Sequence, residues 1–373
     1  MPLSWLDIEL TERCGFDCLH CAVRLDPGRS SASADELGAG ELKRILGEAA
    51  ALGCLTVRFT GGDPLVRNDF PDIYQAARRL GMKVLLFTNA EAITPALAGL
   101  LSRIPPLEPV EITVFGMTER TCETVTRKPG SFARARRGIG LLVEHGVRLA
   151  IKGVLFPFNR SEVEAFEAWA RSLPGSDGLV VWTSLLELRH RRDSDLRNEA
   201  IRRLRLSPGE VAAFLAREKK NYVREMKEFL PRFAGPRGDA VFACGAGRES
   251  GCVDAYGRLQ ACLSLRDPAL TVDLRKTSLA EAMAIINRRI SPLRSANPEF
   301  LRRCARCPLR GLCEQCPAKS WMENGQLDSP VEYFCRVAHA QARGLGLLQE
   351  RENAWEVEDW PARLESLADE KDE

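Results

Sequence analysis

The sequence predicts an α/β fold in which a parallel sheet is followed by a smaller, cysteine-rich region. The first observation is a set of six short runs of β-branched and apolar residues, at residues 5–10, 55–59, 83–87, 110–115, 147–154 and 178–183. The second is a set of amphipathic, helix-like stretches between these runs, at residues 35–52, 69–80, 94–103, 131–145 and 161–172. Strands that alternate with helices build parallel βαβ units, so we expect either an open sheet or a barrel.

Several predicted strands carry polar side chains at every second position, namely Asp7, Glu9, Arg58, Glu111, Thr113 and Lys152. A parallel strand that is buried on both faces is almost wholly apolar. The pattern therefore has two interpretations. Either the second face lines a wet, functional cavity, in which Glu9 and Glu111 are candidate substrate contacts, or some strands lie at an edge or are shifted by one residue.

The composition is that of an ordinary folded protein with room for two domains. The chain has 373 residues, of which 45% are hydrophobic and 28% are charged, and a formal net charge of +2. A charge this close to zero gives no reason to expect a nucleic acid or a membrane as partner. There is neither an apolar window long enough to span a bilayer nor a secretory signal, so we expect a cytoplasmic protein.

The thirteen cysteines are unevenly distributed. Three lie within residues 14–21 and eight within residues 244–335, whereas Cys54 and Cys122 stand alone and are expected to be buried apolar residues. In a chain without a secretory signal, grouped cysteines are more often metal ligands or catalytic thiols than disulfides.

The stretch "ERCGFDCLHC" places Cys14, Cys18 and Cys21 at C-x3-C-x2-C spacing, directly after the first predicted strand. Four thiolates saturate a structural zinc ion or a 4Fe–4S cluster, whereas three leave one coordination position open for a small ligand. These three are the candidate catalytic residues. A zinc site with a distant fourth ligand is the alternative.

The stretch "FTGGDPL", residues 59–65, follows the second predicted strand. Gly61 and Gly62 allow the backbone to approach a ligand closely, and Pro64 stiffens the turn. Taken alone, this segment is a commonplace turn.

Together, the order strand, C-x3-C-x2-C, helix, strand and GGDP resembles the radical S-adenosylmethionine (radical SAM) superfamily. "TERCGFDCLHC" is similar to its cluster loop, although Gly15 stands where asparagine is frequent. "TGGDP" is similar to its methionine-binding "GGEP" turn, with Asp63 in place of glutamate. The resemblance implies a partial (β/α)6 barrel of the TIM type. It also implies a 4Fe–4S cluster whose open iron binds S-adenosylmethionine (SAM) and whose electron cleaves SAM to a 5′-deoxyadenosyl radical.

The same resemblance implies further cofactor-binding positions. "FTNA" is similar to a pocket-rim segment, Thr113 stands where a ribose-contacting serine is common, His20 is a candidate adenine contact, and Lys152 is a candidate partner of the SAM carboxylate or the substrate. The full implied set is His20, Gly61, Gly62, Asp63, Pro64, Thr88, Asn89, Thr113 and Lys152.

The eight later cysteines are enough for two fully ligated clusters or two zinc sites. Their pattern resembles the SPASM domain of peptide-modifying radical SAM enzymes, except that the run C-x2-C-x5-C-x2-C is one residue short at its end. The resemblance implies two auxiliary 4Fe–4S clusters. Their implied ligands are Cys244, Cys252, Cys262 and Cys316 for the first, and Cys304, Cys307, Cys313 and Cys335 for the second.

We therefore expect four regions: a radical SAM barrel (1–186), a helical connecting segment (187–239), a SPASM domain (240–345) and an acidic tail (346–373). The arginine-rich run that begins the connecting segment is interleaved with acids and lacks aromatics, so we interpret it as a solvated surface. We expect one amphipathic helix over residues 208–230, and a tail that frays into solvent after residue 350.

The overall resemblance is to maturases of ribosomally made peptides, including the mycofactocin type. It implies oxidative modification of a peptide or protein side chain, with a thioether, a carbon–carbon crosslink or an unsaturated bond as product. Implied partners are the substrate and an electron donor such as ferredoxin or flavodoxin. Because the barrel begins almost at residue 1, a separate recognition protein is expected if the precursor's leader is bound. The alternatives are a radical dehydrogenase of a small metabolite and a non-enzymatic metal-cluster binding module.

Overall fold

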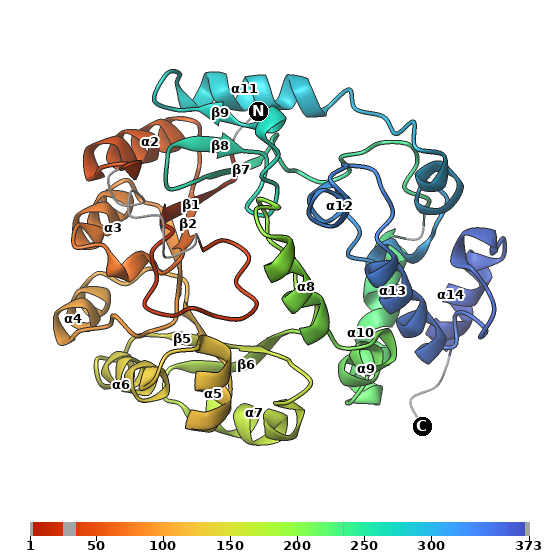
Figure 1. Ribbon diagram of the computed structural model, residues 1–373, viewed down its shortest axis with the longest axis horizontal. Coiled ribbons are helices and arrows are strands. Elements are labelled where there is room, and N and C mark those ends of the chain that lie inside the picture. Colours follow the sequence, from red (N-terminus) through yellow and green to blue (C-terminus); the bar gives the residue numbers. More distant parts are fainter. Residues whose placement is uncertain (1–2, 25–34, 234, 370–373) are drawn as a thin grey trace. The chain divides into compact units, whose positions relative to one another are not determined.

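The computed structural model describes residues 3–24, 35–233 and 235–369 (Figure 1). The chain divides into two compact units. Unit 1 comprises Met1–Leu204 and Gly245–Arg289, and unit 2 comprises Arg205–Cys244 and Ile290–Glu373. The two units divide the chain at different residues from the four regions expected from the sequence. Those four regions stay a prediction.

Unit 1 is built on the six predicted strands, all parallel. They are β1 (Trp5–Thr11), β2 (Thr56–Gly61), β3 (Lys83–Thr88), β4 (Val110–Val114), β5 (Leu149–Val154) and β6 (Ser176–Thr183). They pair in chain order, and β1 pairs on its other side with β7 (Ser250–Val253) rather than with β6. The six strands therefore do not close into a ring, and the predicted α/β fold with a partial barrel is confirmed.

The helices between these strands lie along one side of the sheet (Figure 1). They are α2 (Ala39–Ala51), α3 (Phe70–Arg79), α4 (Pro95–Arg103), α5 (Glu119–Thr126), α6 (Ser131–Glu144) and α7 (Val163–Ser172). Five of them match the predicted helical stretches. Helix α5 was not predicted, because its eight residues are mostly polar; the Thr118 side chain caps it by accepting from Thr121 N.

The strands present two different faces, as their alternation predicts. One face of β1 is fully buried and apolar, with Leu6, Ile8 and Leu10. On the opposite face, the Arg58 guanidinium lies 4.8 Å from the ring centroids of both Trp5 and Phe87 and 3.4 Å from the Asp7 carboxylate. Since β1 and β2 are interior strands, their polar residues line an inner face and are not explained by an edge.

A hairpin from the predicted SPASM region extends the same sheet. Strand β7 is followed by β8 (Arg258–Gln260) and β9 (Val272–Asp273), which are antiparallel, and then by α11 (Leu279–Ile290). The parallel pairing of β7 with β1 brings Cys252 opposite Asp7. Residues about 245 positions apart thus share one face of one sheet.

The arginine-rich segment contributes α8 (Asp195–Leu204) to unit 1, and unit 2 is mainly helical. The helices of unit 2 are α9 (Pro208–Leu215), α10 (Lys219–Phe229), α12 (Pro317–Asn324), α13 (Glu332–Gly344) and α14 (Trp360–Asp369). The single helix expected over residues 208–230 is wrong, because the chain breaks between α9 and α10 at residues 216–218.

The expectation that the acidic tail frays is also wrong as far as residue 369. Trp360, Leu364 and Leu367 of α14 are buried in an apolar cluster with Leu309 and Ala342. The tail contains an amphipathic helix, because its three large apolar side chains are spaced three or four residues apart and so lie on one face. The many acidic residues around them led to the prediction of a frayed tail. Residues 370–373 lie outside the described residues.

Short helical turns complete the fold: η1 (Pro64–Val66), η2 (Arg160–Glu162), η3 (Leu230–Phe233), η4 (Pro268–Leu270), the π-helical turn η5 (Phe300–Cys304), η6 (Leu309–Gly311) and η7 (Ala354–Glu356). Within the described residues, we find no helix with the length and apolar character needed to cross a bilayer.

Candidate active site

The predicted motifs meet where β1, β2 and β3 end. The cysteine loop begins after Thr11 of β1, the GGDP turn begins at Gly61 of β2, and Asn89 follows Thr88 of β3. Because the three strands are parallel and adjacent, their carboxyl ends lie side by side. In barrels of parallel strands this end carries the active site.

The two glycines of the turn let it pack against the base of the cysteine loop. Gly62 N donates to Thr11 O at 2.7 Å, and Asp63 N donates to Arg13 O at 2.9 Å. A Cβ atom on Gly61, whose φ is +125°, would lie 2.1 Å from Thr11 O, and one on Gly62 would lie 2.2 Å from Arg13 O. Only glycine fits at either position, so the turn is joined to the loop by backbone contact.

The Asp63 carboxylate is 1% exposed and is held by three protein donors. One oxygen accepts from Leu65 N at 2.9 Å; the other accepts from Thr88 Oγ1 at 2.8 Å and Asn89 N at 2.9 Å. Burial raises its pKa to about 6, against the opposing effect of these hydrogen bonds. The carboxylate ties the turn to the end of β3, and the buried Pro64 begins η1 directly after it.

Asn89 connects this arrangement to the cysteine loop. Its Nδ2 donates to Cys14 Sγ at 3.3 Å, and its Oδ1 accepts from Glu91 N at 2.8 Å. Asp63 therefore orients Asn89, and Asn89 orients the first thiol. The sequence placed Asn89 at the rim of the cofactor pocket without this link to Cys14.

The three thiols of the loop form one electrostatic group. Burial raises the pKa of Cys14 to about 12 and raises that of Cys18, with the neighbouring thiols Cys14 and Cys21 adding to the effect on Cys18. Backbone N–H groups point at two of the sulfurs, from Phe16 to Cys14 Sγ and from Arg24 to Cys21 Sγ, each at 3.4 Å. Such donors stabilise a metal-bound thiolate.

Three thiolates on one loop suit the donor set of a 4Fe–4S cluster, in which each thiolate binds a different iron. Among the residues with described positions, no three His, Cys, Asp or Glu side chains converge on a point where a single metal ion could sit. Because burial raises the pKa of Cys14 and Cys18, iron binding would have to displace the protons of these two thiols.

Glycine at position 15 has a steric explanation. A Cβ atom there would lie 1.8 Å from Oε2 of Glu91. That carboxylate is fixed by Arg134, whose Nε lies 2.6 Å from Glu91 Oε1. The space beside the loop is therefore filled by Glu91, which accounts for the absence of asparagine at position 15.

The middle of the loop is anchored to α5. Asp17 N donates to Thr126 O and Leu19 N donates to Val125 O, both at 2.9 Å. The Asp17 carboxylate in turn binds Arg24 at 2.6 Å and Arg127 at 2.5 Å.

His20 lies edge-on to two aromatic rings, with centroid distances of 5.4 Å to Phe115 and 5.2 Å to Phe156. Burial lowers its pKa to about 4, so the imidazole is neutral at pH 7.

Lys152 forms an ion pair with Glu111, and its Nζ lies 4.3 Å from the centroid of Phe87. Thr113 is half-buried and is paired in register with Lys152. The lysine thus has a partner on the inner face of the sheet. Glu111, one of the two suggested substrate contacts, is that partner.

Unit 2 contains a cavity of about 180 Å³ that is lined by cysteines. Six of the eight predicted auxiliary ligands line it: Cys244, Cys304, Cys307, Cys313, Cys316 and Cys335. Cys304 ends η5, Cys316 precedes α12, and Cys335 lies on α13.

Four of these thiols act on one another electrostatically. Burial raises the pKa of Cys304 to about 11 and of Cys307 to about 12, and it also raises the pKa of Cys313 and Cys335. Cys335 is among the causes of the shift in each of the other three. These are the four residues that the SPASM resemblance implied for one cluster.

The remaining cysteines lie in unit 1. Cys252 is fully buried on β7, where Glu9 and Asp7 further raise a pKa that burial has already raised. Cys262 follows β8 and is half-buried. The implied set Cys244, Cys252, Cys262 and Cys316 draws on both units and stays a prediction. Cys54 and Cys122 are each 2% exposed, as expected of apolar core residues.

Residues 8–170, which include the cysteine loop, the GGDP turn and strands β2–β5, match the model of the radical SAM superfamily. The chain carries a radical SAM domain. The resemblance drawn from the sequence is thereby confirmed for this part.

Curated relatives align over part of the chain. The PqqA peptide cyclase of Ruegeria pomeroyi is 29% identical over 177 residues, which are 46% of this chain and 46% of the relative. The AdoMet-dependent heme synthase of Methanosarcina barkeri is 32% identical over 140 residues, 38% of each chain. This chain thus spans less than half the length of either relative.

Solved structures share the fold over a longer stretch. Streptococcus suis SuiB bound to precursor peptide SuiA superposes with a TM-score of 0.64 at 16% identity, covering 87% of this chain and 74% of SuiB. Native anSMEcpe with bound AdoMet superposes with a TM-score of 0.65 at 14% identity, covering 99% of this chain and 100% of that one. At these identities the likeness is one of fold.

Proposed function

We propose that the chain is a radical SAM enzyme that oxidatively modifies a side chain of a peptide or protein. The observation that carries the proposal is the junction at the ends of β1–β3. There the GGDP turn is bonded to the base of the cysteine loop, and Asn89 links Asp63 to the thiol of Cys14.

Cys14, Cys18 and Cys21 would hold a 4Fe–4S cluster, which together with bound SAM would supply the radical chemistry that removes a hydrogen atom from the substrate. The chain's own residues position and shield this chemistry. Asn89 and the loop amides stabilise the sulfurs, and His20 offers a neutral aromatic edge near the third thiol.

The GGDP turn is proposed to bind the methionine part of SAM through its backbone. The Asp63 side chain already has three protein donors, so its proposed role is to hold Thr88 and Asn89 at the pocket rim. Thr113 and Lys152 are proposed as contacts further along the inner face. For Lys152 such a contact would require it to share its charge with Glu111.

Two auxiliary 4Fe–4S clusters are proposed in the cysteine-rich region. The electrostatic group Cys304, Cys307, Cys313 and Cys335 supports the second of them. A cluster that accepts an electron from the substrate radical would make the net reaction an oxidation, with a proton lost from the substrate. Ferredoxin or flavodoxin is the proposed external electron donor.

Two similarities support a peptide substrate. One is the sequence similarity to a PqqA peptide cyclase, and the other is the shared fold with SuiB, whose structure was solved with a precursor peptide. A separate recognition protein for that peptide is a further proposal. Oxidation of a small metabolite is the second candidate, supported by the similarity to an AdoMet-dependent heme synthase.

The test is anaerobic reconstitution with iron and sulfide, followed by metal quantitation and dithionite-driven SAM cleavage. Three clusters predict about twelve irons per chain and release of 5′-deoxyadenosine. Cys14→Ala should abolish release, Cys313→Ala should lose about four irons but retain release, and Cys122→Ala, a buried cysteine outside every proposed set, should match the wild type. No iron and no SAM cleavage in the wild type would refute the proposal.

The substrate class needs its own experiment. Candidate peptides encoded beside the gene would be incubated with reconstituted enzyme and followed by mass spectrometry. Loss of two hydrogens from a peptide supports the maturase, whereas turnover of small metabolites alone would favour the second candidate.

A further inference from the structure

Part of the arginine-rich run does not behave as a solvated surface. Arg189 is 2% exposed, His190 is 4% exposed, and the Arg191 side chain is 19% exposed. By contrast, the side chain of Arg203, in the same run, is 77% exposed. A buried arginine needs compensating partners, so the contacts of residues 189–191 carry information about their role.

Residues 189–191 run along the end of the cysteine loop. Arg189 Nη1 donates to Cys21 O at 3.0 Å, His190 N donates to Ala22 O at 3.1 Å, and Arg191 Nη1 donates to Val23 O at 3.2 Å. Three successive residues of one segment thus bond three successive carbonyls of the loop.

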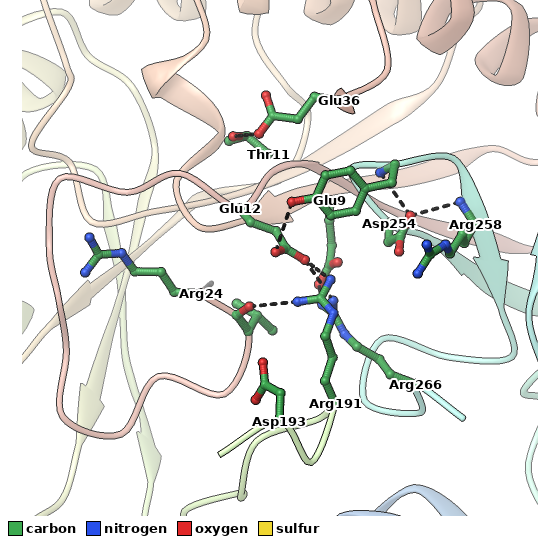
Figure 2. Close-up of polar contacts among 12 residues, drawn as sticks. Glu9, Thr11, Glu12, Arg24, Glu36, Arg191, Asp193, Asp254, Arg258 and Arg266 are labelled. Atoms are coloured by element: carbon green, nitrogen blue, oxygen red, sulfur yellow. Dashed lines mark hydrogen bonds and ion pairs between the residues drawn. The ribbon is translucent and has the colours of Figure 1, made fainter. Parts of the chain in front are cut away.

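Arg191 also reaches the start of the loop. Its other terminal nitrogen forms an ion pair with the carboxylate of Glu12, which is almost fully buried two residues before Cys14 (Figure 2). One planar guanidinium therefore joins the residue that begins the loop to the backbone that ends it. Such a two-sided contact suits arginine, whose donors form a rigid fork.

Glu12 is in turn fixed from the other side. Arg266 Nη1 lies 3.1 Å from Glu12 Oε1, and its other terminal nitrogen binds Glu9 of β1 (Figure 2). The hydroxyl of Tyr256 donates to Glu12 Oε2 at 3.3 Å. Both carboxylates are buried, and burial raises the pKa of Glu9 to about 7, although Arg266 opposes the shift. Neither carboxylate is free to turn toward solvent.

We propose that Arg191 is a positioning residue that closes the cysteine loop, with Arg266 holding Glu12 in place to receive it. By joining Glu12 to Val23, it fixes the distance between the two ends of the loop and so pre-organises the three thiols for the cluster. This inference deepens the proposed function and rests on it for the identity of the bound group. The contacts that close the loop are made between protein groups only, so the closure can be measured in the protein without iron.

The first test uses the apo protein and hydrogen exchange. Arg191→Gln removes the charge and the double contact, and Arg203→Gln removes one positive charge from the exposed part of the same run. Loss of a charge-assisted contact to a buried group corresponds to roughly a 10- to 100-fold change in an opening equilibrium. We expect exchange at the amides of Asp17, Leu19 and Cys21 to accelerate by about that factor in Arg191→Gln only. Exchange in β5 should be unchanged.

The second test uses reconstituted enzyme and the rate at which a chelator removes iron from the loop. A cluster on a loop that opens more often should be lost about 10- to 100-fold faster in Arg191→Gln than in Arg203→Gln. Arg191→Lys keeps the positive charge but carries it on a single nitrogen instead of a planar fork. We therefore expect Arg191→Lys to lose iron nearly as fast as Arg191→Gln.

The outcomes separate the two hypotheses. Equal loop exchange and equal iron loss in Arg191→Gln and Arg203→Gln would overturn the closure, as would full rescue by Arg191→Lys, which would reduce the role to charge alone. If the wild type binds no iron but Arg191→Gln still accelerates exchange in the loop, the proposed function fails and the closure stands.

Discussion

Gly62→Ala probes the junction between the GGDP turn and the cysteine loop. The added Cβ atom would lie 2.2 Å from Arg13 O, 2.6 Å from Arg13 C and 2.7 Å from Glu12 O. All three are backbone atoms, so no side chain can rotate away. Because real Cβ contacts are almost never shorter than 3.0 Å, the turn and the loop must separate by about 0.8 Å or more.

That separation breaks the two hydrogen bonds of the junction, from Gly62 N to Thr11 O and from Asp63 N to Arg13 O. Each is worth about 0.5–1.5 kcal/mol net, so we expect the free energy of unfolding to fall by about 1–3 kcal/mol. The effect on chemistry should be larger, since Cys14 adjoins Arg13. A displacement of about 1 Å at reacting groups typically costs about 100-fold in rate.

Two assays check this: urea unfolding of the apo protein, and dithionite-driven SAM cleavage after reconstitution. Gly47→Ala is the matched control, because Gly47 lies inside α2 and, apart from the backbone of its own helix, no atom lies within 4 Å of the added Cβ. It should stabilise the protein by up to about 1 kcal/mol and leave cleavage unchanged. A Gly62→Ala protein with wild-type stability and wild-type cleavage would refute the steric argument.

Two further predictions concern the cysteine loop. Gly15→Asn should lower the free energy of unfolding by about 1 kcal/mol, because it displaces Glu91 from Arg134. In a Glu91→Ala background, which already lacks that ion pair, Gly15→Asn should cost much less; an equal cost in the two backgrounds, measured by urea unfolding, would contradict the contact. Burial lowers the pKa of His20 to about 4, so the unfolded chain binds this proton more readily and stability should fall as the pH drops from about 6.5 toward 4. His20→Asn should flatten this dependence in the apo protein, and an unchanged pH profile would show that the imidazole is not desolvated.

Local patterns in the sequence were enough for the core of unit 1. The apolar periodicity located the strands β1–β6, and five of the helices between them were found. The spacing of Cys14, Cys18 and Cys21 and the GGDP turn located the loop ends that the parallel sheet then brings together. These features depend on residues that are close in the chain, where side-chain periodicity and turn chemistry act directly.

Other features were missed because they depend on the length or phase of a pattern. Helix α5 is short and polar, and α14 has only a narrow apolar face within an acidic tail. The break between α9 and α10 is likewise set by local detail, since Ser207 and Glu210 form a capping box that starts one helix but does not fix where it ends.

Tertiary structure alone decided which partner each polar group takes. The sequence could offer Asp63 to a cofactor, but the fold gives its carboxylate to Leu65, Thr88 and Asn89. It presented Arg191 as part of a solvated run, but the fold places the guanidinium between Glu12 and Val23, more than 160 residues away in the chain. A buried charge is stable only beside an opposite charge or a donor, and which residues become neighbours is decided by how the strands and loops pack.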